Sequence, residues 1–433
     1  MSSTDVRATA PTSEPDPGAG QYPDRTPLRA AVEAAVATVR RNAAAFGARY
    51  PDSTTRENVY PLRPATAEFA EGANRDWTTS FWPGMQWRAV ELTGDTELRG
   101  AAMAHAADFA RRVHAGEDLD THDLGFLYTL SCVDAWRLAG DEAARDAALA
   151  AADHLMTRFL PSAGIVQAWG DLSDPAQRGR TIVDSLMNMP LLTWATEVTG
   201  DERYADVVAR HVVQVRTHLL RDDDSTFHTF YWDPVSGEPL RGATEQGAGD
   251  DSCWARGQAW GIFGFALHHR TSGDPESLRA SQRCADYFLA HLPADGVPFW
   301  DLVYTDGSQA PRDSSAAAIA VCGLLELASV LPDADRAAAY DAAARRMLAA
   351  LVTGYTPARH QRADALLLHA VYDAPKGKGV DEGCLWGDYY YLEALTRLTL
   401  PGWVSPWWPA APAVPTRDTV TDAVLPDTDG GNA

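Results

Sequence analysis

The sequence predicts an all-α fold, an (α/α)6 barrel in which six helical hairpins form a closed ring. Three observations support this prediction. Alanine-rich helical segments recur along the chain, Gly-Asp pairs separate them from the preceding helices, and the residues between hairpins are rich in Trp, His, Asp and Gly. Loops of that composition, gathered at one end of a ring, would line a pocket. An open solenoid of hairpins is the alternative fold.

Each repeat has the same pattern at its central turn. An apolar helical segment ends, a Gly-Asp pair follows, and an amphipathic segment begins. Glycine is favoured in the left-handed position just past a helix C-terminus, and aspartate is favoured as the N-cap of the next helix. The glycines are Gly94, Gly140, Gly200 and Gly273, and the stretch ASVLPDADRAAAY repeats the pattern with Pro-Asp.

We therefore expect five hairpins, with a sixth completed by the segment that contains WGDYYYLEALTRLTL. Strands are expected to be short and confined to insertions such as STFHTFYWDPVSGEPL. The interior contains no Pro-rich or Ser-rich linker, so residues 28–400 are predicted to form one catalytic domain. Residues 1–27 and 401–433 are rich in Pro, Thr and Asp and are predicted to be tails. Trp403, Trp407 and Trp408 are expected to hold the start of the second tail.

Composition excludes several classes of function. The net charge of −22 over 433 residues disfavours nucleic acid and anionic membranes as partners. We find no apolar stretch long enough for a membrane span and no signal peptide. The five cysteines are widely spaced and include no C-x-x-C pair, which fits free thiols in a reducing compartment. A cytoplasmic protein is expected, and its oligomeric state is left open.

The sequence contains none of the short patterns of metalloproteases, P-loop proteins or serine hydrolases. Neither a metal nor an organic cofactor is predicted. Five other stretches instead place polar groups beside Trp, Phe or Gly at the starts of hairpin elements. They are SFWPGMQW, THDLGFLY, GIVQAWGDLSD, TIVDSLMN and DDSCWARGQAWGIFGFALHH.

Asp184 is an acid within a nearly continuous apolar run, RTIVDSLMNMPLL. Such surroundings disfavour the ionised carboxylate and raise its pKa. Asp184 could then carry a proton near neutral pH and act as a general acid. Asp123, in THDLGF, is the candidate for a second carboxylate with different solvation. For each residue the alternative is an N-cap of the helix that follows.

Arg256 and several tryptophans are candidates for substrate binding. Arg256 lies between Trp254 and Trp260 in WARGQAW, and arginine suits bidentate recognition of a carboxylate. Its alternative is a structural ion pair with an acid such as Asp250 or Asp251. A sugar ring could be held between aromatic walls formed by Trp82, Trp169 and Trp260, and the alternative for each of them is a place in the core.

Taken together, these stretches resemble glycoside hydrolase family 88, the unsaturated glucuronyl hydrolases. The resemblance covers roughly residues 55–400. It rests on FWPGMQW, HDLGF, VQAWG, RTIVDSLMNMPLL, WARGQAWGIFG, DSSAAAIA and KGVDEGCLWGDYYYLEAL, in the family's order. The family fold is an (α/α)6 barrel, which agrees with the hairpin repeats.

The resemblance implies hydration of a vinyl ether. The family's substrates are oligosaccharides left by polysaccharide lyases, with a C4=C5 double bond in the terminal uronic acid. By resemblance, Asp184 protonates C4 and then acts as base toward the water that adds at C5. The hemiketal so formed opens and releases the remaining sugar. Asp123 is implied to hold the substrate hydroxyls and to tune Asp184.

The resemblance also implies a set of substrate-binding residues. His122 lies beside Asp123, and His228 and Gln246 are implied to lie near the uronate and the attacking water. Arg256 and Trp260 match an R-x-x-x-W pair of the family. The remaining positions are Trp82 and Trp169 as walls and Tyr389 as a pocket tyrosine, with its register open among residues 389–391.

The leaving sugar is less clearly specified. Lys376 and Lys378 in VYDAPKGKGVDEG could meet a sulfate, whereas Asp373 would oppose one. An unsaturated rhamnogalacturonyl hydrolase on the same fold is the near alternative, and HDLGF and the placement of Arg256 favour the glucuronyl type. A non-catalytic sugar-binding protein is the alternative from another class, and it would not need both acids.

Overall fold

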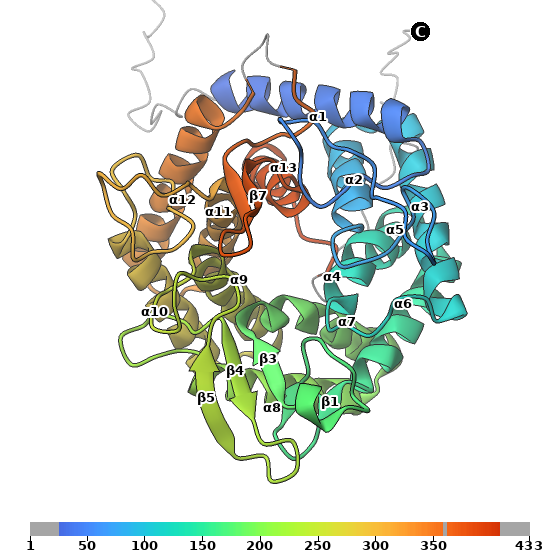
Figure 1. Cartoon of the computed structure of the whole chain (residues 1–433). Helices are drawn as coiled ribbons and strands as arrows, with labels where there is room; N and C mark the ends of the chain where they lie inside the picture. Colours follow the sequence, from blue (N-terminus) through green and yellow to red (C-terminus); the bar gives the residue numbers. More distant parts are fainter. Residues whose placement is uncertain (1–25, 358–361, 408–433) are drawn as a thin grey trace, which may run out of the picture.

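Two concentric rings of helices make up the part of the chain that the structure, a computed structural model, describes: residues 26–357 and 362–407 (Figure 1). Consecutive helices alternate between the rings, so each hairpin has one inner and one outer helix. The predicted (α/α)6 barrel is confirmed, and the open solenoid is not observed, because inner helix α13 packs against both α11 and α2 and closes the ring.

The inner ring is interrupted where it approaches the loops. Its second member is divided by a π-helical turn, η1, and α7 is preceded by a 3-10 turn, η3. The inner elements are α2 (Phe81–Thr93), α4 (Leu124–Tyr128), η1 (Thr129–Val133), α5 (Asp134–Ala139), η3 (Val183–Asn188), α7 (Met189–Thr199), α9 (Ala255–Ser272), α11 (Ser314–Val330) and α13 (Leu385–Thr399).

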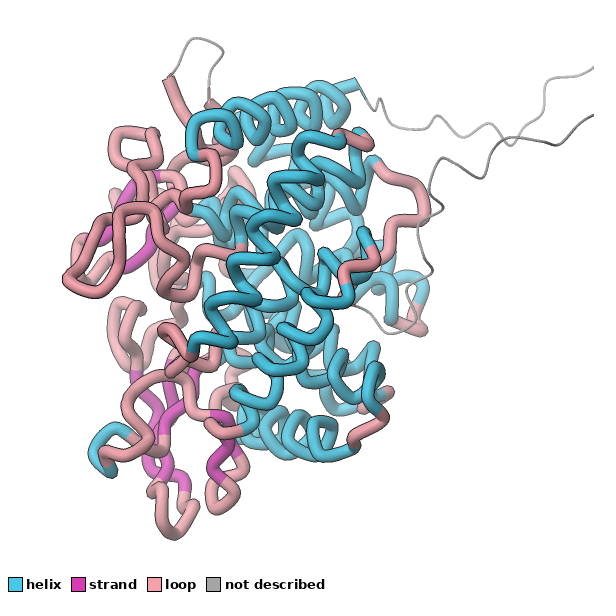
Figure 2. Tube along the Cα trace, turned by 90° about the vertical axis from the view of Figure 1, so that its right-hand side faces the viewer, coloured by secondary structure: helices cyan, strands magenta, loops and turns pink. Residues whose placement is uncertain are grey.

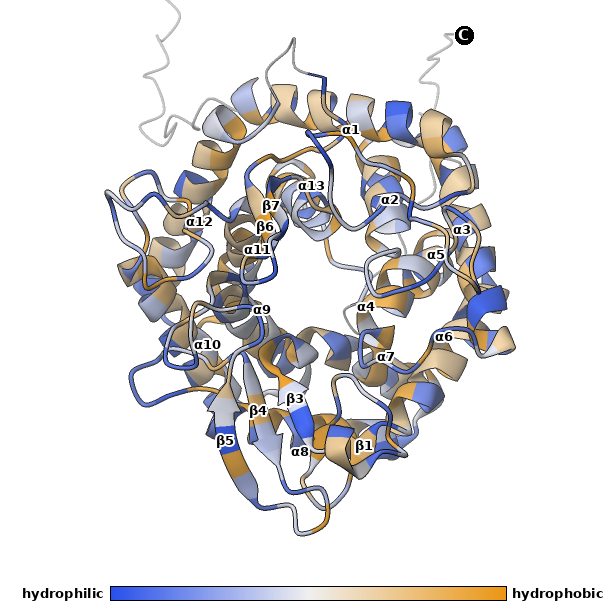
Figure 3. Cartoon of the chain, viewed as in Figure 1, coloured by the Kyte–Doolittle hydropathy of each residue, from blue (hydrophilic) through white to orange (hydrophobic). Residues whose placement is uncertain are grey.

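The outer helices carry hydrophobic residues on the side that packs on the inner ring and polar residues elsewhere, which Figure 3 shows as alternating colours along each helix. They are α1 (Thr26–Phe46), α3 (Thr96–Ala115), α6 (Glu142–Met156), α8 (Glu202–His218), α10 (Pro275–Ala290) and α12 (Ala334–Gly354).

The Gly-Asp turns have the predicted geometry. Gly94, Gly140, Gly200 and Gly273 each follow an inner helix with φ between 71° and 72°. The side chain of the next residue then caps the outer helix. Asp95, for example, accepts hydrogen bonds from the backbone N–H groups of Glu97 and Leu98. Asp333 caps α12 in the same way, so the Pro-Asp variant of the repeat also supplies an N-cap for its outer helix.

The sixth hairpin is built from the two ends of the barrel. Helix α13 comes from the predicted WGDYYY segment, but its outer partner is α1, at the other end of the sequence. The segment after α13 stays packed on the helices. Trp403 donates from Nε1 to Glu91 Oε1 at 2.9 Å, and Trp407 is buried with its ring stacked on Tyr389. The predicted tails, including Trp408, otherwise lie outside the described residues.

The strands are short and lie in the loops between hairpins, as predicted. Figure 2 shows them gathered with the long loops on one side of the helices. The three-stranded sheet has the order β3-β4-β5 and is antiparallel. The strands are β1 (Phe159–Leu160), β2 (Ile165–Val166), β3 (Arg180–Ile182), β4 (Thr229–Trp232), β5 (Pro239–Ala243), β6 (Ala370–Asp373) and β7 (Lys378–Glu382).

Two further findings bear on composition. None of the helices in the described ranges is long and apolar enough to cross a membrane. All five cysteines are buried free thiols.

Candidate active site

A cavity of about 420 Å³ opens at the loop end of the barrel. Six of the predicted site residues line it: His122, Asp123, Trp169, Asp184, His228 and Gln246. They come from five separate loops or turns, which the ring brings together. A larger hollow between α10 and α12, on the outer ring, contains none of the predicted residues.

Asp184 is the second residue of η3, directly after β3. Its side chain reaches the cavity, and its Oδ1 atom has no hydrogen-bond partner among the described residues. Burial raises the pKa of Asp184 well above its usual value, and the charge of Asp123 adds to the effect, whereas Arg256 acts against it. The residue at the cap position of the turn is Ile182, and no side-chain cap bond is formed, so the N-cap alternative is not observed.

Asp123 precedes α4 but does not cap it either. Its Oδ2 atom accepts a hydrogen bond from Thr121 Oγ1 at 2.8 Å, and its Oδ1 atom lies 3.5 Å from Asn188 Nδ2. Burial raises the pKa of Asp123 to about 7, although the hydrogen bonds from Thr121 and Asn188 lower it. The two carboxyls therefore differ in solvation and hydrogen bonding, as the sequence predicted.

Two buried histidines face the same cavity and are neutral. Burial lowers the pKa of His122 well below its usual value, and it lowers the pKa of His228 to about 3. His228 Nδ1 accepts the backbone N–H of Glu245 at 2.9 Å. The neutral ring of His228 must then carry its proton on Nε2, which makes that atom a donor.

Arg256 supports the cavity wall from behind. Its buried guanidinium pairs with Asp313 Oδ2 at 2.9 Å and donates to the backbone oxygen of Tyr372 at 2.7 Å. A longer contact of 3.4 Å joins its Nη2 atom to Gln246 Oε1. The structural ion pair that was the alternative for Arg256 is therefore present, but its partner is Asp313, not Asp250 or Asp251. These contacts already use several of the guanidinium N–H groups, so fewer of them remain to donate to a ligand.

Besides Arg256, three predicted substrate-binding residues do not line the cavity. Trp82 is buried against Phe46 of α1, with the ring centroids 5.4 Å apart. Trp260 packs on Phe126, with the ring centroids 5.5 Å apart. Tyr389 lies between the inner helices, where a Cβ on Gly84 would come within 2.8 Å of its ring. All three residues stand on inner helices, and their side chains are buried against neighbouring helices instead of reaching the loops.

The structure brings other aromatic residues to the cavity, chiefly Trp77 and Tyr372. Trp77 Nε1 donates to the Tyr372 hydroxyl at 2.9 Å, and its ring stacks on Trp386 with centroids 5.2 Å apart. The sequence offered a signal for Trp77, since RDWTTSFW contains two tryptophans. Nothing in the sequence distinguished the loop tryptophan from the helical Trp82. Tyr372 stands in the VYDAPKGKG stretch, which was considered only for its lysines.

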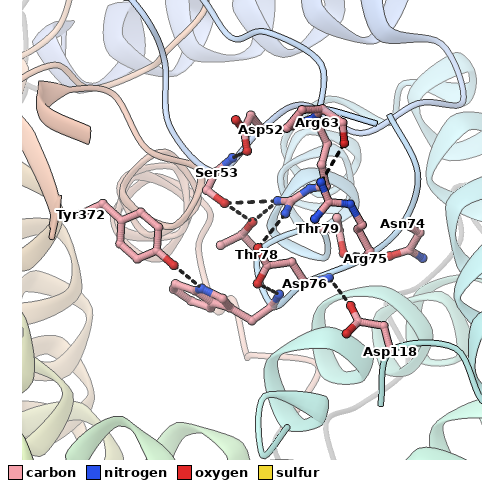
Figure 4. A network of polar contacts seen from close by, with 12 residues as sticks. Asp52, Ser53, Arg63, Asn74, Arg75, Asp76, Thr78, Thr79, Asp118 and Tyr372 are labelled. Atoms are coloured by element: carbon pink, nitrogen blue, oxygen red, sulfur yellow. Dashed lines mark hydrogen bonds and ion pairs between the residues drawn. The ribbon is translucent and has the colours of Figure 1, made fainter. Parts of the chain in front are cut away.

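A polar network holds the loop that carries Trp77 (Figure 4). Buried Arg63 pairs with Asp76 at 3.0 Å and donates to Ser53 Oγ at 3.2 Å. Asp76 has a φ of 68°, a left-handed conformation that costs energy for a residue with a side chain. Its backbone N–H donates to the Asp118 carboxylate. The network thus fixes an otherwise unfavourable backbone next to Trp77.

No group of three or more His, Cys, Asp or Glu side chains in the described ranges is arranged to hold a metal ion. The cavity offers a ligand the central pair of carboxyls, two neutral histidines, amide and hydroxyl groups, and aromatic walls. Further charged residues also line it: Asp76, Asp118, Glu245 and Lys376.

Comparisons with known proteins agree with this site. The chain is 44% identical over 379 residues to the unsaturated chondroitin disaccharide hydrolase of Streptococcus pyogenes, covering 87% of this chain and 92% of that protein. It is 44% identical over 369 residues to the unsaturated glucuronyl hydrolase of Bacillus sp. strain GL1, covering 85% and 96%. The crystal structure of the unsaturated glucuronyl hydrolase from Streptococcus agalactiae superposes with a TM-score of 0.84 at 42% identity, covering 90% and 95% of the two chains.

The profile of one family, described as Glycosyl Hydrolase Family 88, matches residues 53–402, which include every cavity residue described above. With that match and with relatives of 44% identity over most of its length, the chain belongs to glycosyl hydrolase family 88.

Proposed function

We propose that this protein is an unsaturated glucuronyl hydrolase. It hydrates the C4=C5 double bond of the terminal unsaturated uronic acid in short oligosaccharides released by polysaccharide lyases. The observation that carries the proposal is the pair of partly buried carboxyls, Asp184 and Asp123, in one cavity with aromatic walls. The relatives reported above are named for the same activity or for an unsaturated chondroitin disaccharide.

In the proposed mechanism, Asp184 begins the cycle protonated, because its pKa is raised. It donates the proton to C4, which leaves positive charge shared between C5 and the ring oxygen. The Asp184 carboxylate then accepts a proton from the water that adds to C5, and the acid is regenerated. The product at C5 is a hemiketal. It opens by cleavage of the C5–O5 bond to a ketone, and O5 becomes the hydroxyl of a hemiacetal at C1. That hemiacetal collapses to an aldehyde, and the glycosidic oxygen leaves with a proton as the hydroxyl of the released sugar.

Asp123 contributes a second carboxylate whose negative charge opposes ionisation of Asp184 before the reaction. It also offers oxygen acceptors for substrate hydroxyls. His228, with its proton on Nε2, offers a neutral donor to the uronate or to the water. Gln246 presents its amide to the same side of the cavity, since its oxygen is turned toward Arg256. Trp77, Trp169 and Tyr372 supply the walls for the sugar rings.

The leaving-sugar side of the cavity favours unsulfated substrates. Lys376 lines the cavity, but its ammonium is paired with the buried carboxylate of Asp373 at 3.0 Å. Lys378 lies over the ring of Tyr372 with its Nζ atom 4.0 Å from the centroid. Asp76 and Asp118 also line the cavity and would repel a sulfate. We therefore propose unsulfated chondroitin or hyaluronan disaccharides as the preferred substrates.

The first experiment follows the ultraviolet absorbance of the conjugated C4=C5 uronate when the enzyme is added to unsaturated chondroitin, hyaluronan and heparin disaccharides. Absorbance should fall with the wild-type protein. Asp184→Asn removes the transferable proton at nearly constant shape, so the rate should fall by at least about a thousandfold, with disaccharide binding retained in calorimetry. If folded wild-type protein consumed none of these substrates, unsaturated rhamnogalacturonides would be tested next, and then sugar binding without catalysis.

We further propose that the protein acts in the cytoplasm. All five of its cysteines are buried free thiols, which suits a compartment that keeps thiols reduced.

A further inference from the structure

Asn188 ends the same turn that carries Asp184, and its side chain reaches the other acid. The residue is fully buried. Its Oδ1 atom accepts the backbone N–H of Phe126, in α4, at 2.9 Å. Because the oxygen must face that N–H group, the orientation of the amide is determined. Its Nδ2 atom therefore faces Asp123, 3.5 Å from Oδ1 of that carboxyl.

The backbones of the two elements are in close contact at this point. A Cβ on Gly125 would lie 2.2 Å from the Cα of Asn188, so α4 and η3 pack with no room for a side chain between them. Asn188 also directly precedes α7, where asparagine commonly caps the helix with its side chain. Here it makes no cap bond. The side chain is used instead to connect α4 and Asp123 to the turn of Asp184.

We propose that Asn188 is a positioning residue that keeps Asp123 ionised and so leaves the proton of the pair on Asp184. The inference rests on the proposed function. An N–H donor stabilises a charged carboxylate. When two neighbouring carboxyls hold one proton between them, the proton resides on the one whose charged form is less stabilised by its surroundings. Thr121 and Asn188 both donate to Asp123 from their side chains. Asp184 has backbone N–H groups of its own turn, from Asp184 and Ser185, but its Oδ1 atom has no partner among the described residues, and burial disfavours its charge more strongly.

The other charged or titratable groups around Asp123 do not replace this contact. Asp76, from the loop before α2, disfavours its ionised form. Asp184, from η3, opposes it only when Asp184 is itself ionised. Arg158, just after α6, favours ionisation through space. His122 Nε2 lies 3.4 Å from Asp123 Oδ1, but burial lowers the pKa of its imidazole, so the ring is neutral and adds no positive charge. Among the described residues, Asn188 supplies the N–H hydrogen bond to this carboxyl.

The test is the pH dependence of kcat/KM on an unsulfated unsaturated chondroitin disaccharide. Activity requires Asp123 to be ionised, so the acid limb of the profile reports its titration. Asn188→Ala removes the donor and should move the acid limb upward by about one pH unit, with kcat lowered about tenfold. Asn188→Asp keeps the shape and the acceptor for Phe126. It also replaces the amide donor with a third carboxyl, which should move the limb at least as far.

Ser185→Ala is the matched control. Ser185 lies in the same buried turn, but its hydroxyl is paired with His211 Nε2 at 2.8 Å, away from the acids. Its loss should leave the acid limb in place. If Asn188→Ala does not fold, Asn188→Asp decides the question. A folded Asn188 variant that lost activity with an unmoved acid limb, or an equal shift in Ser185→Ala, would show that Asn188 is merely structural. A wild-type protein inactive on every unsaturated disaccharide would instead remove the proposed function, and this inference with it.

Discussion

At the scale of single residues, the site depends on placing similar groups in different surroundings. Asp184 and Asp123 are the same residue type, yet the free oxygen of one and the donors around the other separate them. His228 shows the same principle, because one backbone N–H decides which ring nitrogen carries the proton. The tryptophans differ in the same sense. Trp77 and Trp82 are near neighbours in the sequence, and of the two Trp77 reaches the cavity.

The pH profile of activity should be bell-shaped. Burial raises the pKa of Asp123 to about 7 and that of Asp184 well above its usual value, with Asp184 the more strongly shifted. Activity should therefore fall on the acid side as Asp123 becomes protonated, and on the alkaline side as Asp184 loses its proton. Initial rates measured across the acid, neutral and alkaline ranges check this. A plateau that extends unchanged across the alkaline range would contradict the role of Asp184.

Trp77 and Trp82 offer a matched pair of substitutions. Trp77→Ala removes a cavity wall and should raise KM by roughly threefold to tenfold, because an aromatic contact contributes about 0.5–1.5 kcal/mol. The loss of its contacts with Tyr372 and Trp386 should lower the melting temperature less than the loss of the fully buried Trp82. Trp82→Ala should instead lower the stability by about 3–5 kcal/mol and leave KM nearly unchanged. Steady-state kinetics and thermal melts of both variants check the assignment. The reverse pattern would restore Trp82 as the wall.

At the scale of elements, the turn that carries Asp184 is positioned by very close packing. Asp184 stands on a short 3-10 turn, which has little stability of its own. Two glycines let neighbouring helices support it. Gly125 in α4 lies against Asn188, and a Cβ on Gly264 in α9 would come within 2.4 Å of Leu186. The turn is therefore held from two sides, and the position of Asp184 follows from that contact.

Gly125→Ala should separate α4 from the turn. The new methyl group would overlap the backbone of Asn188, and such overpacking costs about 1–3 kcal/mol. Because both acids are attached to these elements, kcat should fall together with the melting temperature. The control is Gly100→Ala in α3, where a Cβ meets nothing within 4 Å. That change should be neutral or stabilise by up to about 1 kcal/mol. If Gly125→Ala kept full activity, the close packing would not be what positions the acids.

At the scale of the whole molecule, closure of the ring brings distant loops to one cavity. Helix α1 pairs with α13 across almost the full length of the sequence, and α13 joins α11 to α2. Every inner helix thus has two inner neighbours. In an open solenoid, by contrast, the hairpin at each end would have a neighbour on one side only. The segment that includes Trp403 adds to this closure through Glu91 of α2.

Unfolding should accordingly be a single cooperative transition. Helix content measured by circular dichroism and tryptophan fluorescence should have the same midpoint in urea, since no hairpin at the edge of the ring can unfold first. Weakening the closing pair, for example with a substitution of buried Ala35 in α1 by aspartate, should lower that midpoint for both signals together. Two separated transitions in the wild-type protein would indicate that the ring is not one folding unit.

Local patterns in the sequence predicted the hairpins of the ring and singled out two acids that the structure places in one cavity. A Gly-Asp turn is determined by neighbouring residues, since the left-handed glycine and the capping aspartate act within a few positions of each other. Asp184 was recognisable because its immediate neighbours are apolar. The short strands in the insertions were predicted for the same kind of local reason.

Only the tertiary structure decided which side chains meet across the ring. The partner of Arg256 is Asp313, the outer partner of α13 is α1, and the walls of the cavity include Trp77 and Tyr372 instead of Trp82, Trp260 and Tyr389. These contacts join residues far apart in the sequence. They depend on where each inner helix ends and on how it is rotated in the barrel. Such rotation is set by packing against both neighbours at once, which no local pattern records.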